Sequence, residues 1–243
     1  MTATLRNGSV GFDVALLQLQ LNLRSSPGPD LEVDGSFGPR TGAAVAAYQR
    51  RAGLVVDGIA GPKTMQSLAR GAAVTAVNHK VEHIAQPTRT TCWAAATAMI
   101  TGSNVPSVRA RTPATMLASD GGLANSSESD QAVVTGSRYG NLHGLRCHAP
   151  MSWSVKGLLD ALQRSPLMLD MLWNTSDYTQ GKGSPGHMVI VSAVVSGDSA
   201  MGNRTHLLVL DPWPERRGRV RWVEYQRWMY EVPTRTYRLF ERL

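Results

Sequence analysis

Cysteine is scarce in this chain of 243 residues, which contains only Cys92 and Cys147. Two cysteines cannot build the disulfide framework of a small secreted domain, so we expect synthesis in a reducing cytosol and a thiol kept for another use. Long hydrophobic runs are also lacking, since no stretch approaches the roughly 18 apolar residues of a membrane-spanning helix. Insertion into a membrane is therefore not expected.

The first residues, MTATLRNGSVGFDV, lack the basic segment and the apolar core of a Sec-type signal peptide. We therefore expect a protein made in the cytoplasm without such a leader. The hydrophobic fraction of 42% is enough to bury a core, and the length allows two modest domains. The net charge of +7 and the pI of 9.8 favour contact with nucleic acid, anionic lipid or an anionic cell wall, without choosing among them.

A short internal repeat lies in the first part of the chain. The segment VDGSFGPRTGAAV at 33–45 recurs as VDGIAGPKTMQSL at 56–68, with six identical positions. Each copy has an Asp-Gly turn and then a Gly-Pro pair, which places a proline in the first turn of a helix. Ahead of the repeat, Val14, Leu17 and Leu21 recur at helical spacing. These patterns predict a small three-helix module.

Residues 5–70 resemble the peptidoglycan-binding domain that many cell-wall hydrolases carry. The resemblance lies in the G-x-x-V-x-x-L-Q-x-x-L opening, in the V-D-G-x-x-G-P-x-T repeats, and in the segment A-x-x-A-Y-Q-R-R-A-G-L between them. It implies binding to glycan or stem peptide, without catalysis by this module. The alternative is a bare helical bundle that happens to repeat, which packing alone would seldom produce.

The remainder of the chain places helices before strands. Residues 71–85 are interpreted as a linker or as the lead-in to a second domain that begins near Val77. Helices are expected from Thr91 and over 154–165, the second ended by Pro166. Apolar runs predict strands, which lie at 167–173, 187–196, 205–212, 219–226 and 234–243. We therefore expect an α+β chain with one domain at 1–72 and a second, ending in an antiparallel sheet, at 73–243.

Cys92 stands at the expected start of an alanine-rich helix in TTCWAAATAMITG, residues 90–102. A helix N-terminus offers unpaired N–H groups and the positive end of the helix dipole, both of which favour a thiolate. Thr90 or Thr91 is a candidate N-cap. A lone cysteine is about as often a small buried hydrophobe, so the nucleophile interpretation needs other residues in support.

Three further residues provide that support. Gln86 precedes Cys92 by six positions, so its amide and the Cys92 backbone N–H would together donate to an oxyanion. His187 opens one expected strand and Asp211 closes the next. If these strands form a hairpin, the two side chains would meet as a base and its orienting carboxylate.

Residues 86–214 resemble the papain-like cysteine peptidases, especially the compact bacterial ones. The matching features are Q-x5-C-W-A-A at a helix start, G-H at a strand start and L-D-P on the next strand. The resemblance implies that Cys92 is the nucleophile, His187 the general base and acid, Asp211 the residue that orients the imidazole, and Gln86 the oxyanion donor. Papain itself has asparagine in the third role, and the aspartate leaves the mechanism intact. Residues 103–150 match nothing clearly, so no pocket residue is identified.

Other residue groups predict neither a metal nor a cofactor. His143, Cys147 and His148 have no standard zinc spacing and no fourth ligand. Three tryptophans lie between arginines near the C-terminus, and alternation with charged residues assigns them to the buried face of a strand, not to stacking on nucleic acid; they are Trp213, Trp222 and Trp228. No nucleic-acid partner is expected.

A wall-binding module joined to an acyl-transfer site predicts a wall-targeted thiol hydrolase, because the module would concentrate substrate at the catalyst. The expected substrate and partner is peptidoglycan, cleaved at amide bonds of stem peptides or cross-links by a monomeric enzyme. The alternatives are a wall-tethered cysteine protease acting on proteins and a binding protein with an inert papain-like domain.

The lack of a Sec leader predicts another way outward, either type VI secretion of an interbacterial toxin effector or lysis by a phage-type endolysin. Such an effector would act in the periplasm or wall of a target cell. In that case we expect the producing cell to make a small immunity protein that covers the cleft around Cys92 and His187.

Overall fold

The structure is a computed structural model whose described residues are 4–70, 73–124, 137–151, 153–172, 186–197, 202–231 and 237–243. The chain is a mixture of helices and antiparallel sheet, which confirms the expected α+β class. It divides into two compact units. Unit 1 comprises Met1–Asn78, Val194–Leu207 and Trp222–Gln226, and unit 2 comprises His79–Ala193, Leu208–Arg221 and Arg227–Leu243. No helix among the described residues is long and apolar enough to cross a membrane.

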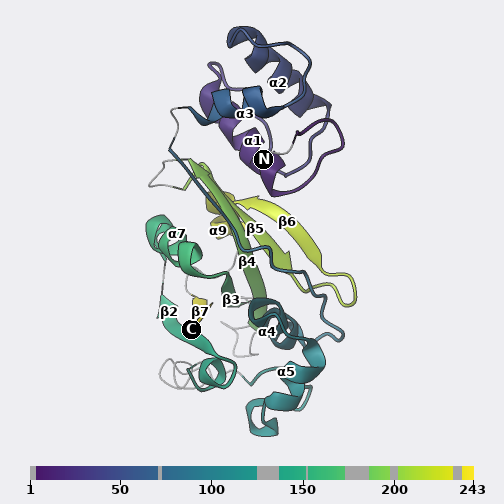
Figure 1. The fold of residues 1–243 in the computed structure, drawn as a ribbon. Coiled ribbons are helices and arrows are strands. Elements are labelled where there is room, and N and C mark those ends of the chain that lie inside the picture. The colour runs from purple at the N-terminus through teal and green to yellow at the C-terminus, as the bar shows by residue number, and fades with distance from the viewer. Residues whose placement is uncertain are drawn as a thin grey trace. The chain divides into compact units, whose positions relative to one another are not determined.

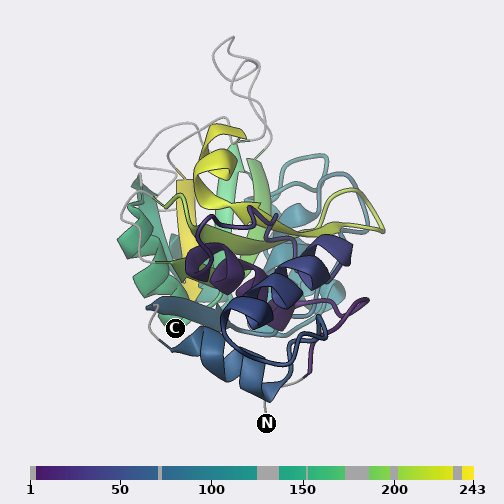
Figure 2. The ribbon, with the colours of Figure 1, turned by 90° about the horizontal axis from the view of Figure 1, so that it is seen from above.

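Three helices begin unit 1, as the repeat predicted: α1 (Phe12–Arg24), α2 (Pro39–Arg51) and α3 (Pro62–Ala69). Figures 1 and 2 show them grouped together. Pro39 and Pro62 occupy the first turns of α2 and α3, where the missing N–H has no helical partner to lose. Val14, Leu17 and Leu21 of α1 are all buried in the core that the helices share.

A buried glutamine holds the Asp-Gly loop of each repeat. The amide of Gln18 donates to Asp34 Oδ1 at 2.8 Å, and its carbonyl accepts from the N–H of Gly35. The amide of Gln49 donates to Asp57 Oδ1 at the same distance of 2.8 Å, and its carbonyl accepts from the N–H of Gly58. The sequence repeat therefore encodes two copies of one polar clamp.

A second face of α1 is buried in another cluster of unit 1. Ala15 and Leu19 pack there with Val195 of β4 (Gly186–Gly197) and with Trp222 of β6 (Arg219–Glu224). The ring of Phe12 lies 6.2 Å from that of Trp222, measured between centroids. Two faces of α1 are therefore buried, one in each cluster.

Seven strands of the described chain form one sheet in the order β2-β7-β3-β4-β5-β6, with β1 also paired to β4. The five expected strands are confirmed as β3 (Leu167–Leu172), β4, β5 (Thr205–Asp211), β6 and β7 (Tyr237–Arg242). Two strands were missed: β1 (Val74–Asn78) and β2 (Leu145–Met151). Strand β1 lies in the segment 71–85, which shows no strand pattern in the sequence. Strand β2 lies at the edge of the sheet, where polar side chains hide the strand pattern.

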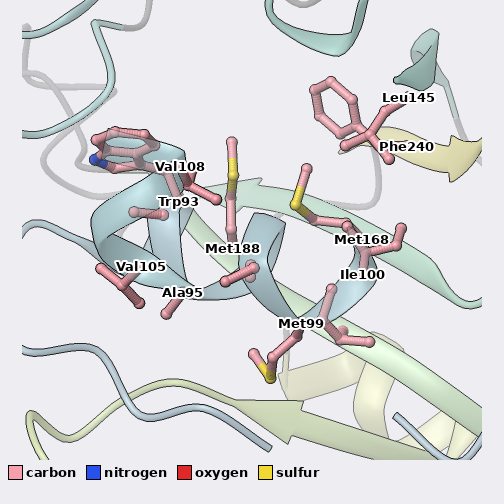
Figure 3. Packing of buried hydrophobic residues seen from close by; sticks show 14 of the residues in the cluster. Trp93, Ala95, Met99, Ile100, Val105, Val108, Leu145, Met168, Met188 and Phe240 are labelled. Atoms are coloured by element: carbon pink, nitrogen blue, oxygen red, sulfur yellow. The ribbon is translucent and has the colours of Figure 1, made fainter. Parts of the chain in front are cut away.

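Buried helix α4 (Cys92–Thr101) packs on the sheet of unit 2. Its residues from Cys92 to Ile100 are all buried, because four alanines allow close packing on every side. Figure 3 shows Met168 and Met188, from β3 and β4, beside this helix together with Phe240 from β7. The expected helix start at position 92 is thereby confirmed.

The remaining helices of the described chain are α5 (Val105–Arg111), the 3-10 turn η1 (Ala114–Met116), α7 (Val155–Arg164) and α9 (Tyr225–Glu231), together with helical residues at 137–142. Helix α7 confirms the prediction for 154–165, and the Ser154 hydroxyl caps it by accepting from the N–H of Gly157 at 3.0 Å. The prediction for Trp228 was wrong. Strand β6 ends at Glu224 and helix α9 begins at the next residue, so Trp228 is buried on a helix and not on a strand.

Candidate active site

Cys92 is the first residue of α4, and Thr91 is the N-cap residue, as expected. The Thr91 hydroxyl does not cap the helix, however, because it donates to the carbonyl of Thr88 at 3.1 Å and accepts from the Thr88 N–H. The Cys92 Sγ lies 3.9 Å from the carbonyl oxygen of Gly186, the residue that precedes His187. The tertiary fold thus brings the thiol to the start of β4.

Burial dominates the electrostatics of this thiol. It raises the pKa of Cys92 to about 11, although backbone N–H groups of Met188 and Trp93 lower it in part and the charges of Asp170 and Asp211 raise it further. The helix start alone therefore does not produce a thiolate at neutral pH. A proton acceptor close to the sulfur is needed.

His187 and Asp211 meet as the sequence predicted. His187 Nε2 lies 2.7 Å from Asp211 Oδ1, which joins the second residue of β4 to the last residue of the neighbouring β5. The same Oδ1 accepts from the backbone N–H of Trp213 at 2.8 Å. Because Nε2 faces the carboxylate, Nδ1 is the ring nitrogen for exchange with a thiol.

Gln86 is buried next to the segment that follows Asp211. Its backbone N–H donates to the carbonyl of Pro212 at 3.0 Å, and its own carbonyl accepts from the N–H of Arg216 at 2.9 Å. The side-chain Nε2 donates to the carbonyl of Thr88 at 2.7 Å, which leaves one amide hydrogen of this group for an oxyanion. Two backbone hydrogen bonds thus tie the expected oxyanion donor to the loop after the expected orienting residue.

His83 also supports this loop, although we had interpreted the segment 71–85 as linker. The half-buried ring places Nε2 at 2.9 Å from the backbone carbonyl of Asp211. The ring packs against Gly218, whose φ is 58°, so that a side chain at 218 would collide with His83. The sequence could not predict this contact, because His83 lies in a segment with no strand or helix pattern.

The side chains of His143, Cys147 and His148 do not form one metal-binding site, because the two histidines have different partners. His143 Nε2 bonds the Thr112 hydroxyl at 3.0 Å, whereas His148 Nε2 lies 3.1 Å from Glu241 Oε1. Within the described ranges, no three His, Cys, Asp or Glu residues form a metal-binding group. Cys147 lies on β2, half-buried, and burial raises the pKa of its thiol to about 11.

An open groove on the three-helix module is the second candidate site. It lies between the two repeat loops, and its lining consists of Arg6, Asn7, Phe37, Gly38, Pro39, Gly42, Ala43, Asp57, Gly58 and Ile59. Three of the lining residues are glycines, beside which backbone groups can approach a ligand closely. The backbone N–H of Ile59 and the amide of Gln49 lower the pKa of Asp57 at its edge.

Several known proteins share short stretches with this chain. A zinc D-Ala-D-Ala carboxypeptidase of Streptomyces albus G is 43% identical over 67 residues, which are 28% of this chain and 26% of that protein. The N-acetylmuramoyl-L-alanine amidase CwlM of Mycobacterium tuberculosis is 49% identical over 59 residues, which are 24% of this chain and 14% of that protein. The chain thus spans about a quarter or less of the length of these two relatives.

Two solved structures also share a stretch of sequence with this chain. The Burkholderia AP3 phage endolysin is 47% identical over a match that covers 29% of this chain and 26% of that one, with a TM-score of 0.27. The N-terminal domain of SleB is 37% identical, with coverage of 29% and 93% and the same TM-score of 0.27.

Family models assign both parts of the chain. A peptidoglycan-binding domain model matches residues 11–68. A second model, that of the papain-like cysteine protease AvrRpt2, matches residues 74–229, which include Cys92, His187, Asp211 and Gln86. The suspected architecture is confirmed: this chain belongs to the AvrRpt2-type family of papain-like cysteine proteases and carries an N-terminal peptidoglycan-binding domain.

Proposed function

We propose that this protein is a wall-targeted cysteine hydrolase that cleaves amide bonds in the stem peptides or cross-links of peptidoglycan. The observation that carries the proposal is the His187–Asp211 pair, 2.7 Å apart, at the strand start that contacts the Cys92 thiol. A buried thiol beside an oriented imidazole is the arrangement that acyl transfer requires. The peptidoglycan-binding domain in the same chain supports the substrate class.

The proposed reaction begins with transfer of the Cys92 proton to His187 Nδ1. The thiolate attacks the scissile carbonyl, and the oxyanion that forms accepts hydrogen bonds from the Cys92 backbone N–H and the Gln86 amide. The C–N bond breaks as His187 returns the proton to the leaving amine. Water, deprotonated by His187, then releases the acid from the thioester and restores the thiol.

Burial of Cys92 makes the base indispensable to this scheme. A thiol with a pKa of about 11 is almost entirely protonated at neutral pH, so attack has to be coupled to proton transfer. Asp211 holds the ring in the tautomer that leaves Nδ1 toward sulfur, and its charge stabilises the imidazolium. The bond from the Trp213 N–H keeps that carboxylate in place.

The substrate class rests on the first 70 residues, not on the catalytic groups. Both curated relatives named above act, by their names, on peptidoglycan components. A module that binds the wall raises the effective concentration of stem peptides at the catalyst, without any new contact at the active site.

Digestion of purified sacculi tests this proposal, with casein as the parallel substrate. We expect mass spectrometry of the soluble products to show new amine and carboxyl ends in muropeptides. The Cys92→Ala variant should bind sacculi as the parent does and release products at least roughly 10³-fold more slowly. Cleavage of casein together with intact sacculi would favour the second candidate, a wall-tethered protease, which the family of cysteine proteases itself suggests.

We further propose that the enzyme is delivered to another cell as an antibacterial effector, with a cognate immunity protein that covers the cleft around Cys92 and His187; release by lysis as an endolysin is the alternative. The observation behind this proposal is a peptidoglycan-binding domain joined to a papain-like cysteine protease domain in one chain. Production in the periplasm of an unprotected cell should cause lysis, and Cys92→Ala should abolish it. A harmless active enzyme in that compartment would contradict the effector proposal.

A further inference from the structure

The main chain of Asp211 carries a contact that the mechanism above does not use. His83 Nε2 lies 2.9 Å from the carbonyl oxygen of Asp211. Since a carbonyl oxygen only accepts, Nε2 carries a proton and donates to it. The side chain of Asp211 in turn accepts from His187 Nε2, which lies 2.7 Å from Oδ1. Two hydrogen bonds through one residue therefore connect His83 to the imidazole of the candidate site.

The peptide bond that His83 contacts joins Asp211 to Pro212. Proline has no N–H, so the carbonyl oxygen is the polar group through which the fold can hold this peptide plane. The orientation of the plane decides where the N–H of Trp213 lies, and this N–H donates to Asp211 Oδ1 at 2.8 Å. A rotation of the plane would therefore separate this donor from the carboxylate that faces His187.

The loop after Asp211 leaves a fitted space for the His83 ring. Gly218 has a φ of 58°, and its N–H donates to the carbonyl of Pro214 at 2.7 Å. A Cβ at position 218 would overlap Cε1 and Nε2 of the ring and would lie 2.7 Å from the Asp211 carbonyl oxygen. A glycine is thus needed on both counts, the left-handed backbone and the close approach of the ring.

The segment from His83 to Gln86 lies alongside this loop. Gln86 holds the loop through its main chain, by the bonds to the Pro212 carbonyl and the Arg216 N–H at 3.0 and 2.9 Å. The contact to Asp211 itself comes from the side chain of His83. A substitution can therefore remove the support of Asp211 and leave every backbone hydrogen bond of the loop available.

We propose that His83 is a positioning residue, which fixes the Asp211–Pro212 peptide plane and thereby the carboxylate that orients His187. The inference rests on the proposed cysteine chemistry. His83 contacts none of the reacting groups and acts through Asp211. Without its hydrogen bond, the carboxylate would hold the His187 ring less firmly, although Cys92, His187 and Asp211 would all still be present.

Two substitutions at position 83 test this role. His83→Leu removes the donor and keeps most of the side-chain volume, whereas His83→Gln keeps an amide N–H as many bonds from the main chain as Nε2. The readout is alkylation of Cys92 by iodoacetamide at neutral pH, followed in the full chain by mass spectrometry of the Cys92 peptide. The rate should fall by roughly tenfold in His83→Leu, since small displacements of catalytic groups cost up to about 10² in rate. His83→Gln should restore most of it.

Nitrogen NMR of the His187 ring, in the Cys92→Ala background, provides a second readout. The neutral ring should carry its proton on Nε2 while Asp211 holds it, and His83→Leu should give a mixture of the two tautomers. If His83→Leu does not fold, His83→Asn replaces it in both measurements, because its amide is one bond too short to reach the carbonyl.

His79→Leu is the matched control. His79 is half-buried like His83, and its Nε2 lies 2.6 Å from the carbonyl oxygen of Leu162 on α7. Both substitutions remove a hydrogen bond from an imidazole to a main-chain carbonyl, but Leu162 is not one of the candidate catalytic residues. His79→Leu should leave the alkylation rate of Cys92 and the His187 tautomer unchanged.

Folded variants at position 83 that keep the parent's rate and tautomer, whatever their thermal midpoints, would show a merely structural contact and overturn the inference. Equal slowing by His79→Leu would overturn it as well. His187→Ala in the same assay separates this inference from the proposed function. If His187→Ala also leaves the rate unchanged, the proposed cysteine chemistry fails, whereas slowing in His187→Ala alone overturns only the role of His83.

Discussion

The repeat loops of unit 1 and the candidate active site of unit 2 assemble their polar residues over different distances along the chain. Gln18 reaches Asp34 over 16 residues, and Gln49 reaches Asp57 over 8. Cys92 contacts Gly186 over 94 residues. Local contacts leave a recurring sequence pattern, whereas the long-range ones exist only after the sheet has formed. Stability of the first region should therefore depend on single clamps, and reactivity of the second on the fold as a whole.

The largest effect is expected for His187→Ala in the candidate active site, where it should change the reactivity of Cys92. Without the imidazole, the Cys92 thiol keeps the pKa of about 11 that burial gives it. Alkylation of Cys92 by iodoacetamide at neutral pH should slow by roughly 10²-fold or more, and then accelerate about tenfold per pH unit as the pH rises toward that pKa. An unchanged rate at neutral pH would mean that His187 does not accept the proton.

Gln18→Leu tests how far one clamp stabilises the repeat loops of unit 1. It removes a buried amide that bonds Asp34, Ser36, Thr41 and Gly35, and leaves their groups without this partner. The free energy of unfolding should fall by about 2 kcal/mol, measured by urea denaturation.

Gln49→Leu should destabilise the second repeat in the same direction, whereas the exposed Gln66→Leu on α3 should change little. Equal stability of the parent and both clamp variants would contradict the clamp role.

Gly42→Leu would separate wall binding from catalysis by filling the groove between the repeats. A Cβ at this position would meet only the Phe37 ring, 3.5 Å away, so the fold should tolerate the change. Binding to sacculi in a pull-down assay should weaken by about tenfold, with cleavage of soluble stem peptides unaffected. Gln66→Leu serves again as the control, and full binding by Gly42→Leu would place the wall contact elsewhere.

Cys147→Ser should have the smallest effect. This residue lies half-buried on β2, where its thiol contacts the His148 carbonyl at 3.6 Å. Burial raises the pKa of this thiol to about 11, so it is protonated at neutral pH. Activity should stay within about twofold of the parent in the sacculus assay. A loss like that of Cys92→Ala would mean that the wrong cysteine was chosen.

The positions of the candidate catalytic residues could be predicted because each carries a local signal. Cys92 starts an alanine-rich helix, His187 follows a glycine at a strand start, and Asp211 precedes a proline at a strand end. Their roles stay proposals. The burial that raises the pKa of Cys92 could not be predicted, because it depends on how α4 packs on strands distant in sequence.

The sequence by itself determined the class of the chain, its three-helix module, helix α4 and five of the seven described strands, because periodicity and turn residues record contacts with near neighbours. Tertiary structure decided the rest. Strands β1 and β2 are paired into the sheet, and residues 225–231 form a helix. The ring of His83 lies against the backbone carbonyl of Asp211. Tertiary structure also set Asp170 opposite Arg238 across 68 residues, since strand register, which no local pattern encodes, selects the partner of a buried charge.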